Sequence, residues 1–200
     1  MLFSKEYLNE TSKIANLINY SDIEEAVKIL VNTRENGGRL FIIGAGGSAS
    51  TSSHAVNDFR KICKIESYSP LDNTAELTAL INDEGWEHVF ELWLSESKLN
   101  KNDTLLIFSV GGGDLDKNIS ANLVRALYYA ISRGASTIGI VGRDGGWTAR
   151  LANCTILIPT INNARITPHV EEFGGIILHL LVSHPLLQIN KTTWEYENEE

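Results

Sequence analysis

Four short, nearly continuous apolar runs constrain the fold of this sequence more than any other feature. Strands that helices cover on both faces are apolar at nearly every position, whereas half-exposed antiparallel strands alternate apolar and polar residues. Segments with helical periodicity separate the runs, so the sequence predicts an α/β three-layer sandwich with a parallel sheet in the middle. The four predicted strands are Leu40 to Ile43, Leu105 to Val110, Thr137 to Val141 and Thr155 to Pro159.

Apolar residues at spacings of three and four predict the helices. Two leading helices come first, and the stretch from Ser21 to Glu24 predicts a capping box at the start of the second. A fifth strand within residues 65–71 is a weaker prediction, because Pro70 cannot donate a hydrogen bond to a sheet. The predicted helices are 8–18, 23–30, 54–62, 87–94, 121–132 and 170–182.

Length and composition bound the organisation of the chain. Its 200 residues, 43% of them hydrophobic and 21% charged, suit one globular domain that buries a full core. We expect a single domain over 1–200, with leading helices in 1–36 and a frayed acidic tail in 190–200. No repeat or linker divides the sequence.

The charge and the apolar runs exclude several classes of partner. A net charge of -8 without a cluster of Lys or Arg argues against nucleic-acid binding, which depends on neutralising phosphates. No apolar run approaches eighteen residues and no leader is recognisable, so we expect no membrane partner and a reducing, cytoplasmic location. Cys63 and Cys154 are interpreted as small buried hydrophobic residues.

A glycine-rich stretch, GAGGS, follows the first predicted strand and runs into a helix. Backbone N–H groups, a serine hydroxyl and the positive end of a helix together bind anions, and glycine allows a ligand to approach the backbone closely. We therefore expect Gly46, Gly47 and Ser48 to bind a phosphate, although a purely structural glycine turn is the simpler alternative. The spacing is not GxGxxG, and no acidic residue is placed to bind a ribose, which disfavours a dinucleotide.

A second loop of this type follows the next buried run. Ser109, Gly111 and Gly112 lie at the end of that strand, and Ser120 occupies the expected N-cap position of the helix that begins at Ala121. Loops after parallel strands open at the same edge of a sheet, so both loops can converge on one small anionic ligand. A phosphorylated metabolite is the predicted ligand.

In combination, these motifs resemble the SIS (sugar isomerase) domain, and specifically its phosphoheptose isomerase branch. The residues that carry the resemblance are GAGGS, NDEGWEHVF at 82–90, the loop at Ser109 and EEFGGIILH on the last helix. The resemblance implies a five-stranded parallel sheet, a homotetramer and aldose–ketose isomerisation of sedoheptulose 7-phosphate to D-glycero-D-manno-heptose 7-phosphate for surface polysaccharide. It covers nearly the whole chain.

The resemblance also assigns roles to four side chains. It places Asp58 as the catalytic base and His179 as the catalytic histidine, and it makes His54, Asp58, Glu171 and His179 the candidate ligands of a zinc ion. The chain departs from the family pattern at Asp58, where a glutamate is usual, and at Glu171, where a glutamine is usual. It also departs at Ala45, where an asparagine is usual, and in a second loop lengthened by residues 114–118.

Helical geometry leaves the ligand set open. His54 and Asp58 are four residues apart, about 40° around a helix, so they share one face. Glu171 and His179 are about 80° apart, whereas Glu172 and His179 are about 20° apart, so either glutamate remains a candidate.

Two residues near the start of the last helix are further candidates. Arg165 lies in the preceding loop and is expected to face a sugar hydroxyl or the phosphate. His169 is an alternative metal ligand. The stretch from Arg143 to Gly146 follows the fourth strand and is interpreted as a turn.

Three functions fit these residues. The first is the phosphosugar isomerase. The second is a non-catalytic SIS module that binds a sugar phosphate or associates with a replication initiator, and the third is an isomerase or epimerase of another sugar phosphate. The presence of both histidines and both carboxylates favours an enzyme, since a binding module needs the serines but no acid and base.

Overall fold

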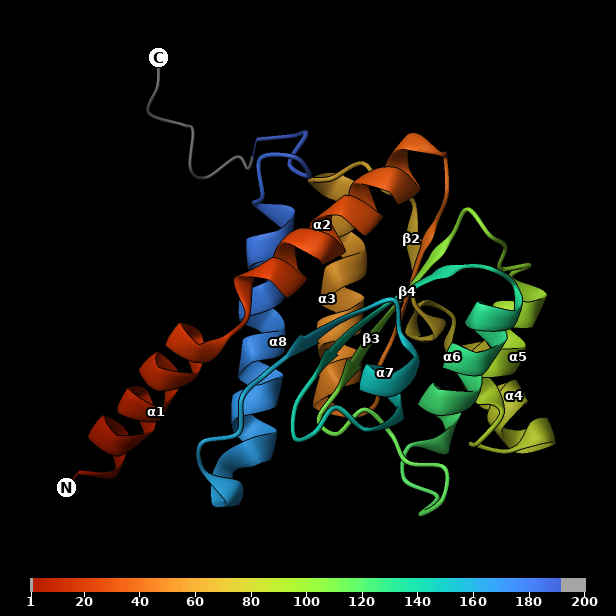
Figure 1. Cartoon of the computed structure of the whole chain (residues 1–200). Helices are drawn as coiled ribbons and strands as arrows, with labels where there is room; N and C mark the ends of the chain where they lie inside the picture. The colour runs from red at the N-terminus through yellow and green to blue at the C-terminus, as the bar shows by residue number, and fades with distance from the viewer. Residues whose placement is uncertain (1, 192–200) are drawn as a thin grey trace.

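The computed structural model describes residues 2–191 and contains one five-stranded parallel sheet between two layers of helices (Figure 1). The strand order is β2-β1-β3-β4-β5. The strands are β1 (Leu40–Ile43), β2 (Ser67–Tyr68), β3 (Thr104–Ser109), β4 (Ser136–Val141) and β5 (Cys154–Leu157). The α-helices are α1 (Phe3–Leu17), α2 (Tyr20–Glu35), α3 (Gly47–Lys61), α4 (Thr74–Glu84), α5 (Val89–Glu96), α6 (Ala121–Ser132), α7 (Gly146–Leu151) and α8 (Ile166–Val182).

The α/β sandwich and the parallel strands expected from the sequence are confirmed. The weak fifth strand is present as β2, a two-residue edge strand, and Pro70 lies two residues after it, at the start of a short 3₁₀ helix (Pro70–Asp72). A proline is well suited to that position because it has no N–H to lose. The α4 and α7 helices were not predicted, and α3 begins at Gly47, seven residues before the predicted start at His54.

The predicted capping box of α2 is wrong. The N-cap is Asn19, whose side chain accepts a hydrogen bond from the Ser21 backbone N–H at 3.2 Å. Ser21 therefore lies inside the first turn of the helix, where its own side chain cannot cap it.

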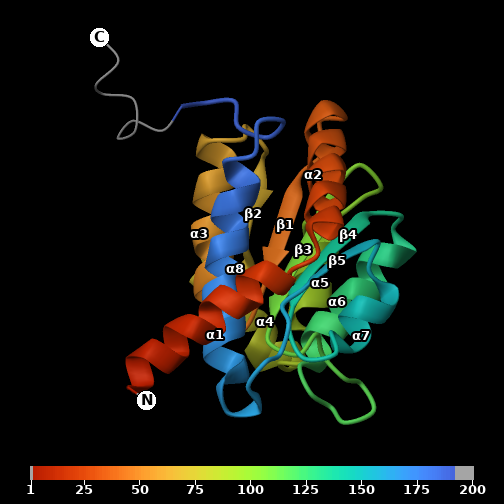
Figure 2. The same ribbon diagram turned by 60° about the vertical axis from the view of Figure 1, so that its left-hand side comes forward.

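The core has two halves, one on each face of the sheet. Leu40 and Ile42 of β1 pack against α2, α3 and α8, while Phe41 and Ile43 pack toward α5 and α6. Side chains alternate between the faces of a strand, so a four-residue strand with every residue buried requires helices on both sides. In both views α3 and α8 lie side by side (Figure 2).

The sheet order places the two serine-bearing loops next to each other. β1 pairs with β3 over the whole of β1, from Leu40 opposite Thr104 to Ile43 opposite Ile107. The chain runs outward from this pair in both directions, so the order of strands reverses here. Ligands of open parallel sheets bind at such a reversal, beyond the carboxyl ends of the strands.

A cluster of ionic hydrogen bonds attaches α1 to the start of α8. Glu10 of α1 accepts hydrogen bonds from Arg165 at 2.8 Å and from Asn162 at 2.7 Å, and its other oxygen lies 2.9 Å from the His169 ring. Arg165 also donates to Glu6 at 3.0 Å. The hydrogen bond with His169, followed by those with Asn162 and Arg165, lowers the pKa of Glu10 to about 2.

The remaining expectations concern the ends and the cysteines. Asn190, the first residue of the expected frayed tail, donates a hydrogen bond to the Lys61 carbonyl at 2.7 Å, while residues 192–200 lie outside the described part. Cys63 and Cys154 are free and buried, and burial raises their pKa values to about 12 and 11. Among residues 2–191, no helix combines the length and the apolar character needed to span a bilayer.

The Glu10 cluster predicts a pH-dependent stability. The folded pKa is about 2 and the ordinary value is 4.5, so the contribution is complete above about pH 4.5 and is lost as the pH falls toward 2. We expect Glu10→Gln to be less stable than the wild type at pH 7 by urea unfolding, and we expect this difference to shrink steadily as the pH falls from about 4.5 toward 2. A difference that stays constant with pH would contradict the assignment. Glu6→Gln should have the smaller effect, because among residues 2–191 the Glu6 carboxylate is bonded to Arg165 alone.

Candidate functional site

The loops after β1, β3 and β4 line a cleft of about 430 Å³ at the carboxyl edge of the sheet. Ser48, Ser109, Gly111 and Ser120 all line it, so the structure brings together the serines of both predicted loops. We call it the serine–glycine cleft. Serine hydroxyls and charged side chains line this cleft at the carboxyl edge of a parallel sheet, which suits a polar ligand.

The first loop places a helix start at this cleft. Gly46 is the N-cap of α3 with φ of 63°, a value that favours glycine, and Gly47 begins the helix. Ser48 is only 6% exposed and lies in the first turn. The fifteen-residue helix therefore directs its positive end and the Ser48 hydroxyl toward the cleft.

The second loop is locked to the segment that follows β4. Ser109 accepts a hydrogen bond from the Gly112 N–H at 3.1 Å, and Thr148 donates to the Gly112 carbonyl through both its N–H and its hydroxyl, at 3.0 and 2.7 Å. A Cβ on Gly112 would overlap the Gly145 carbonyl oxygen, and φ at Gly112 is 70°. Gly112 is thus required by packing, apart from any contact with a ligand.

Ser120 adopts an unusual conformation at the end of the lengthened loop. It holds the N-cap position of α6, as expected, but its φ is 47° and its side chain makes no capping hydrogen bond. Left-handed conformations of non-glycine residues have a cost and collect at functional sites. Asp114 and Lys117 close the loop with an ion pair of 2.9 Å, and the Lys117 hydrogen bond lowers the pKa of Asp114.

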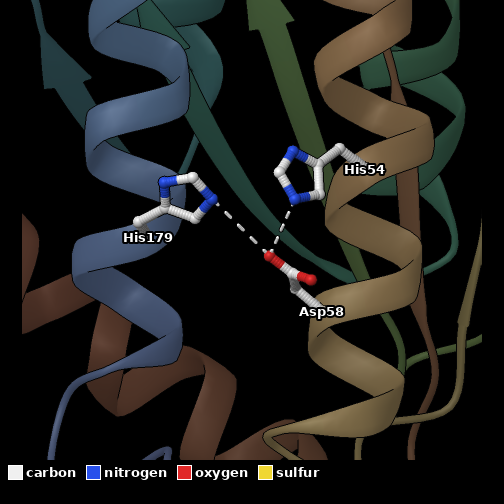
Figure 3. Close-up of side chains that lie close together, drawn as sticks. All are labelled: His54, Asp58 and His179. Carbon is white, nitrogen blue, oxygen red and sulfur yellow. Dashed lines mark ion pairs between the residues drawn. The ribbon is translucent and has the colours of Figure 1, made fainter. Parts of the chain in front are cut away.

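A separate cluster lies between α3 and α8, where two histidines approach one aspartate (Figure 3). Asp58 Oδ2 lies 3.2 Å from His54 Nε2 and 3.8 Å from His179 Nε2. The other oxygen of Asp58 accepts a hydrogen bond from Asn57 at 2.8 Å. The Asp58 side chain is 11% exposed, whereas those of His54 and His179 are 50% and 60% exposed, so the cluster opens to the surface.

The donor atoms of this cluster fit a metal ion. One ligand atom from each of His54, Asp58 and His179 lies within 4.8 Å of the others. Two imidazoles and a carboxylate are a donor set that zinc prefers, and three protein ligands leave a coordination position open for another oxygen. Of the four residues expected to hold a metal, the structure brings these three together.

Glu171 lies elsewhere. Its carboxylate packs against Gly47 at the start of α3, and Glu171 lines a small cavity with Ser48 and Ser109. Eight residues of α-helix rise about 12 Å, which separates Glu171 from His179 along α8. The angle between Glu171 and His179 around the helix does not include this separation along the helix axis, so the angle alone could not exclude Glu171 as a ligand.

The other candidate metal ligands, and Arg165, which was expected to contact the substrate, are also outside the cluster. Glu172 is exposed and is not among the grouped donor residues of the described chain. His169 is 3% exposed and bonded to Glu10, and Arg165 is held by Glu6 and Glu10. Neither His169 nor Arg165 lines the serine–glycine cleft.

Comparison with known proteins identifies the family. A family model described as the SIS domain matches residues 6–142. A phosphoheptose isomerase of Aliarcobacter butzleri is 32% identical over 192 residues, which are 92% of this chain and 93% of the relative. The chain belongs to the SIS-domain family, in its phosphoheptose isomerase branch. The resemblance seen in the motifs is thereby confirmed.

A second sequence relative and one solved structure are also similar to this chain, and the structure supports the fold. The lincomycin biosynthesis protein LmbN of Streptomyces lincolnensis is 35% identical over 169 residues, or 80% of this chain and 58% of LmbN. The structure of the phosphoheptose isomerase GmhA from Neisseria gonorrhoeae aligns with a TM-score of 0.77 at 22% identity, covering 90% of this chain and 95% of that one.

Several residues that line the cleft were not predicted from the sequence. Lys117, Arg143, Trp147 and Arg150 line it, and Arg143 was interpreted only as part of a turn. Arg143 follows β4 at the same edge of the sheet as the two serine loops. The rule that located those loops, that residues after parallel strands meet at one edge, also applies to Arg143.

The interlocked loops predict different results for two glycines. Gly112→Ala should lower the free energy of unfolding by about 1–3 kcal/mol or more, because φ is positive and the Gly145 carbonyl occupies the space. Gly175→Ala, on α8 with no atom near the added Cβ, should stabilise by up to about 1 kcal/mol. Urea unfolding measures both, and equal stabilities of the two variants would show that the loops are not locked.

Proposed function

We propose that this protein is an aldose–ketose isomerase that converts sedoheptulose 7-phosphate to D-glycero-D-manno-heptose 7-phosphate through an enediol, for heptose used in surface polysaccharide. The phosphoheptose isomerase relatives support the reaction. The observation that carries the proposal is the position of two polar sites along one helix. The serine–glycine cleft lies at the start of α3, and the His54–Asp58–His179 cluster lies further along it.

The separation of these sites fits the substrate. Six residues of helix from Ser48 to His54 rise about 9 Å, and ten residues from Ser48 to Asp58 rise about 15 Å. In a heptulose 7-phosphate the phosphate and the reacting carbons, C1 and C2, are at opposite ends of the carbon chain. A phosphate in the cleft would direct the far end of the sugar along α3 toward the cluster.

The cluster supplies the groups that the chemistry needs. Isomerisation removes a proton from one carbon and returns it to the neighbouring carbon, while a second proton moves between the two oxygens. Asp58 is the proposed base for the carbon-bound proton, and Asn57 holds its other oxygen. His179, on the facing helix, is the proposed carrier of the proton on oxygen.

We further propose zinc as the metal, with His54, Asp58 and His179 as its ligands. A bound zinc ion would act as a Lewis acid toward the substrate oxygens. Asp58 would then serve both as a zinc ligand and as the base. The hydrogen bond from Asn57 helps to orient the Asp58 carboxylate for both roles. Glu171, near Ser48, is available to contact the sugar between the two sites.

Assembly into a homotetramer completes the proposal. Large apolar side chains are exposed on α1 and on the α8 surface next to His179: Leu2, Phe3, Leu8, Leu17, Ile176 and Leu180. Apolar surface of this extent on adjacent helices is typical of protein–protein contacts. The cytoplasmic location stays a prediction.

The reaction predicts a specific loss in one variant. Asp58→Asn should lower proton exchange at the substrate carbon by about 10²- to 10⁴-fold, the contribution of a general base, and should leave phosphate binding intact. Exchange followed by NMR in heavy water, with sedoheptulose 7-phosphate and a panel of other ketose phosphates, measures this. Glu172→Gln is the matched control and should exchange at the wild-type rate. If the wild type binds sugar phosphates but exchanges none, the protein is a binding module.

The proposed ligand set predicts different effects for substitutions at two residues of α8, His179 and Glu171. His179→Gln should lower both zinc content and turnover, by at least about 10-fold, because it removes one of three ligands. Glu171→Gln should keep its zinc, because Glu171 is about 12 Å away along the helix. Elemental analysis of the purified variants is the measurement. Zinc lost from Glu171→Gln and retained in His179→Gln would refute the ligand set.

The assembly proposal is tested by mass. Light scattering should give four times the 22.1 kDa chain mass at micromolar concentration. Leu8→Glu together with Leu17→Glu should shift the protein to smaller species, because charges would be buried in the contact. A wild-type monomer would exclude any site shared between subunits.

A further inference from the structure

We propose that Arg143 binds the phosphate group of the substrate in the serine–glycine cleft, an assignment that rests on the phosphosugar substrate proposed above. Arg143 lies two residues after the end of β4, at the sheet edge where the Ser48 and Ser109 loops open. It lines the same cleft as both serines.

Three cationic side chains line this cleft, and two of them are already engaged. Lys117 forms an ion pair of 2.9 Å with Asp114. The Arg150 guanidinium lies 5.9 Å from the centre of the Trp147 ring. Among residues 2–191, no hydrogen bond or ion pair holds the Arg143 guanidinium, which leaves its charge available to a ligand.

The acidic residues of the cleft do not neutralise Arg143. Asp114 is bound to Lys117, and Asp144 accepts a hydrogen bond from the Gly146 N–H at 3.2 Å. In the described part of the chain, neither acid forms an ion pair with Arg143. An unpaired guanidinium in a cleft with serine hydroxyls is a combination that suits a phosphate.

The backbone supports a functional reason for this arginine. Arg143 has φ of 55°, a left-handed conformation that glycine adopts with less strain than arginine. Two other left-handed positions in the same turn, Gly145 and Gly146, are occupied by glycine. A non-glycine residue held in this conformation has a cost of folding that function can explain. The turn alone would favour glycine at position 143, so the arginine there points to a role for its side chain.

Gly111 on the facing loop makes room for this side chain. A Cβ at Gly111 would lie 3.3 Å from the Arg143 Cδ, which is a tight contact. With glycine there, the aliphatic part of Arg143 passes over the loop that carries Ser109 and Ser120. The serines and the α3 start supply neutral donors, and Arg143 adds the full charge that a protein of net charge -8 needs close to an anion.

The experiment uses Arg143→Gly, which fits the left-handed backbone and should fold at least as well as the wild type. Isothermal titration with inorganic phosphate should show affinity about 10- to 100-fold weaker, the effect of losing a charge-assisted hydrogen bond. With sugar phosphate as substrate, KM should rise by a similar factor while kcat stays within about threefold, as for lost uniform binding. Arg143→Lys should retain part of the affinity.

Two matched controls isolate the side chain. Lys98→Gly removes a residue with φ of 54° at the opposite edge of the sheet and should leave phosphate affinity unchanged. Arg150→Ala removes the same charge from the same cleft and should weaken phosphate binding about threefold or less. Melting temperatures of all variants show whether any loss comes from unfolding.

The outcomes are distinct from those of the isomerase assay. Phosphate affinity that is unchanged in Arg143→Gly overturns this inference, even if the enzyme isomerises heptulose phosphate. Equal losses in Arg143→Gly and Arg150→Ala also overturn it, because they would reflect the charge of the cleft as a whole. If the wild type isomerises no sugar phosphate but binds inorganic phosphate through Arg143, the isomerase proposal fails and this inference stands.

Discussion

The parallel pairing of β1 with β3 places the ends of two strands, and with them two serine-bearing loops, beside each other at one edge of the sheet. Each loop alone is an ordinary glycine turn with a few free donors. Because neighbouring parallel strands end at the same edge, Ser48 and Ser109 face a common cleft. The β4 end, next in the sheet, adds Arg143 to the same place.

The packing of α3 against α8 extends this site in a second direction. Both helices run away from the edge that carries the cleft, with Glu171 against Gly47 at one end and His179 near Asp58 at the other. Helix rise converts their sequence separations into distance, about 1.5 Å for each residue. An anion site and a proton-transfer site are thereby held apart on rigid elements, as a long phosphorylated sugar requires.

Three of the five non-glycine residues with positive φ in residues 2–191 lie in the loops around the cleft: Asn118, Ser120 and Arg143. Ser120 and Arg143 have left-handed backbones, and Gly112 packs so closely on Gly145 that an added Cβ would overlap the Gly145 carbonyl oxygen. Hydrogen bonds from Thr148 to Gly112 connect the loop after β3 to α7. These contacts hold the loops after β3 and β4 together at the cleft. Backbone strain of this kind is typical of functional sites.

The sequence by itself determined the buried strands, because a strand covered on both faces must be apolar at every position and such runs are easily recognised. Local spacing at the strand ends also pointed to Ser48 and Ser109. The family resemblance pointed to His54 and Asp58, and their spacing of four residues placed them on one helix face. Local spacing could not place Glu171, because the angle between two residues around α8 says nothing of the rise of about 12 Å between them along the helix. It also could not assign Arg165, because α1 holds that side chain through Glu6 and Glu10 and it does not line the cleft. These contacts join residues far apart in the chain, so only the packing of the elements decided them.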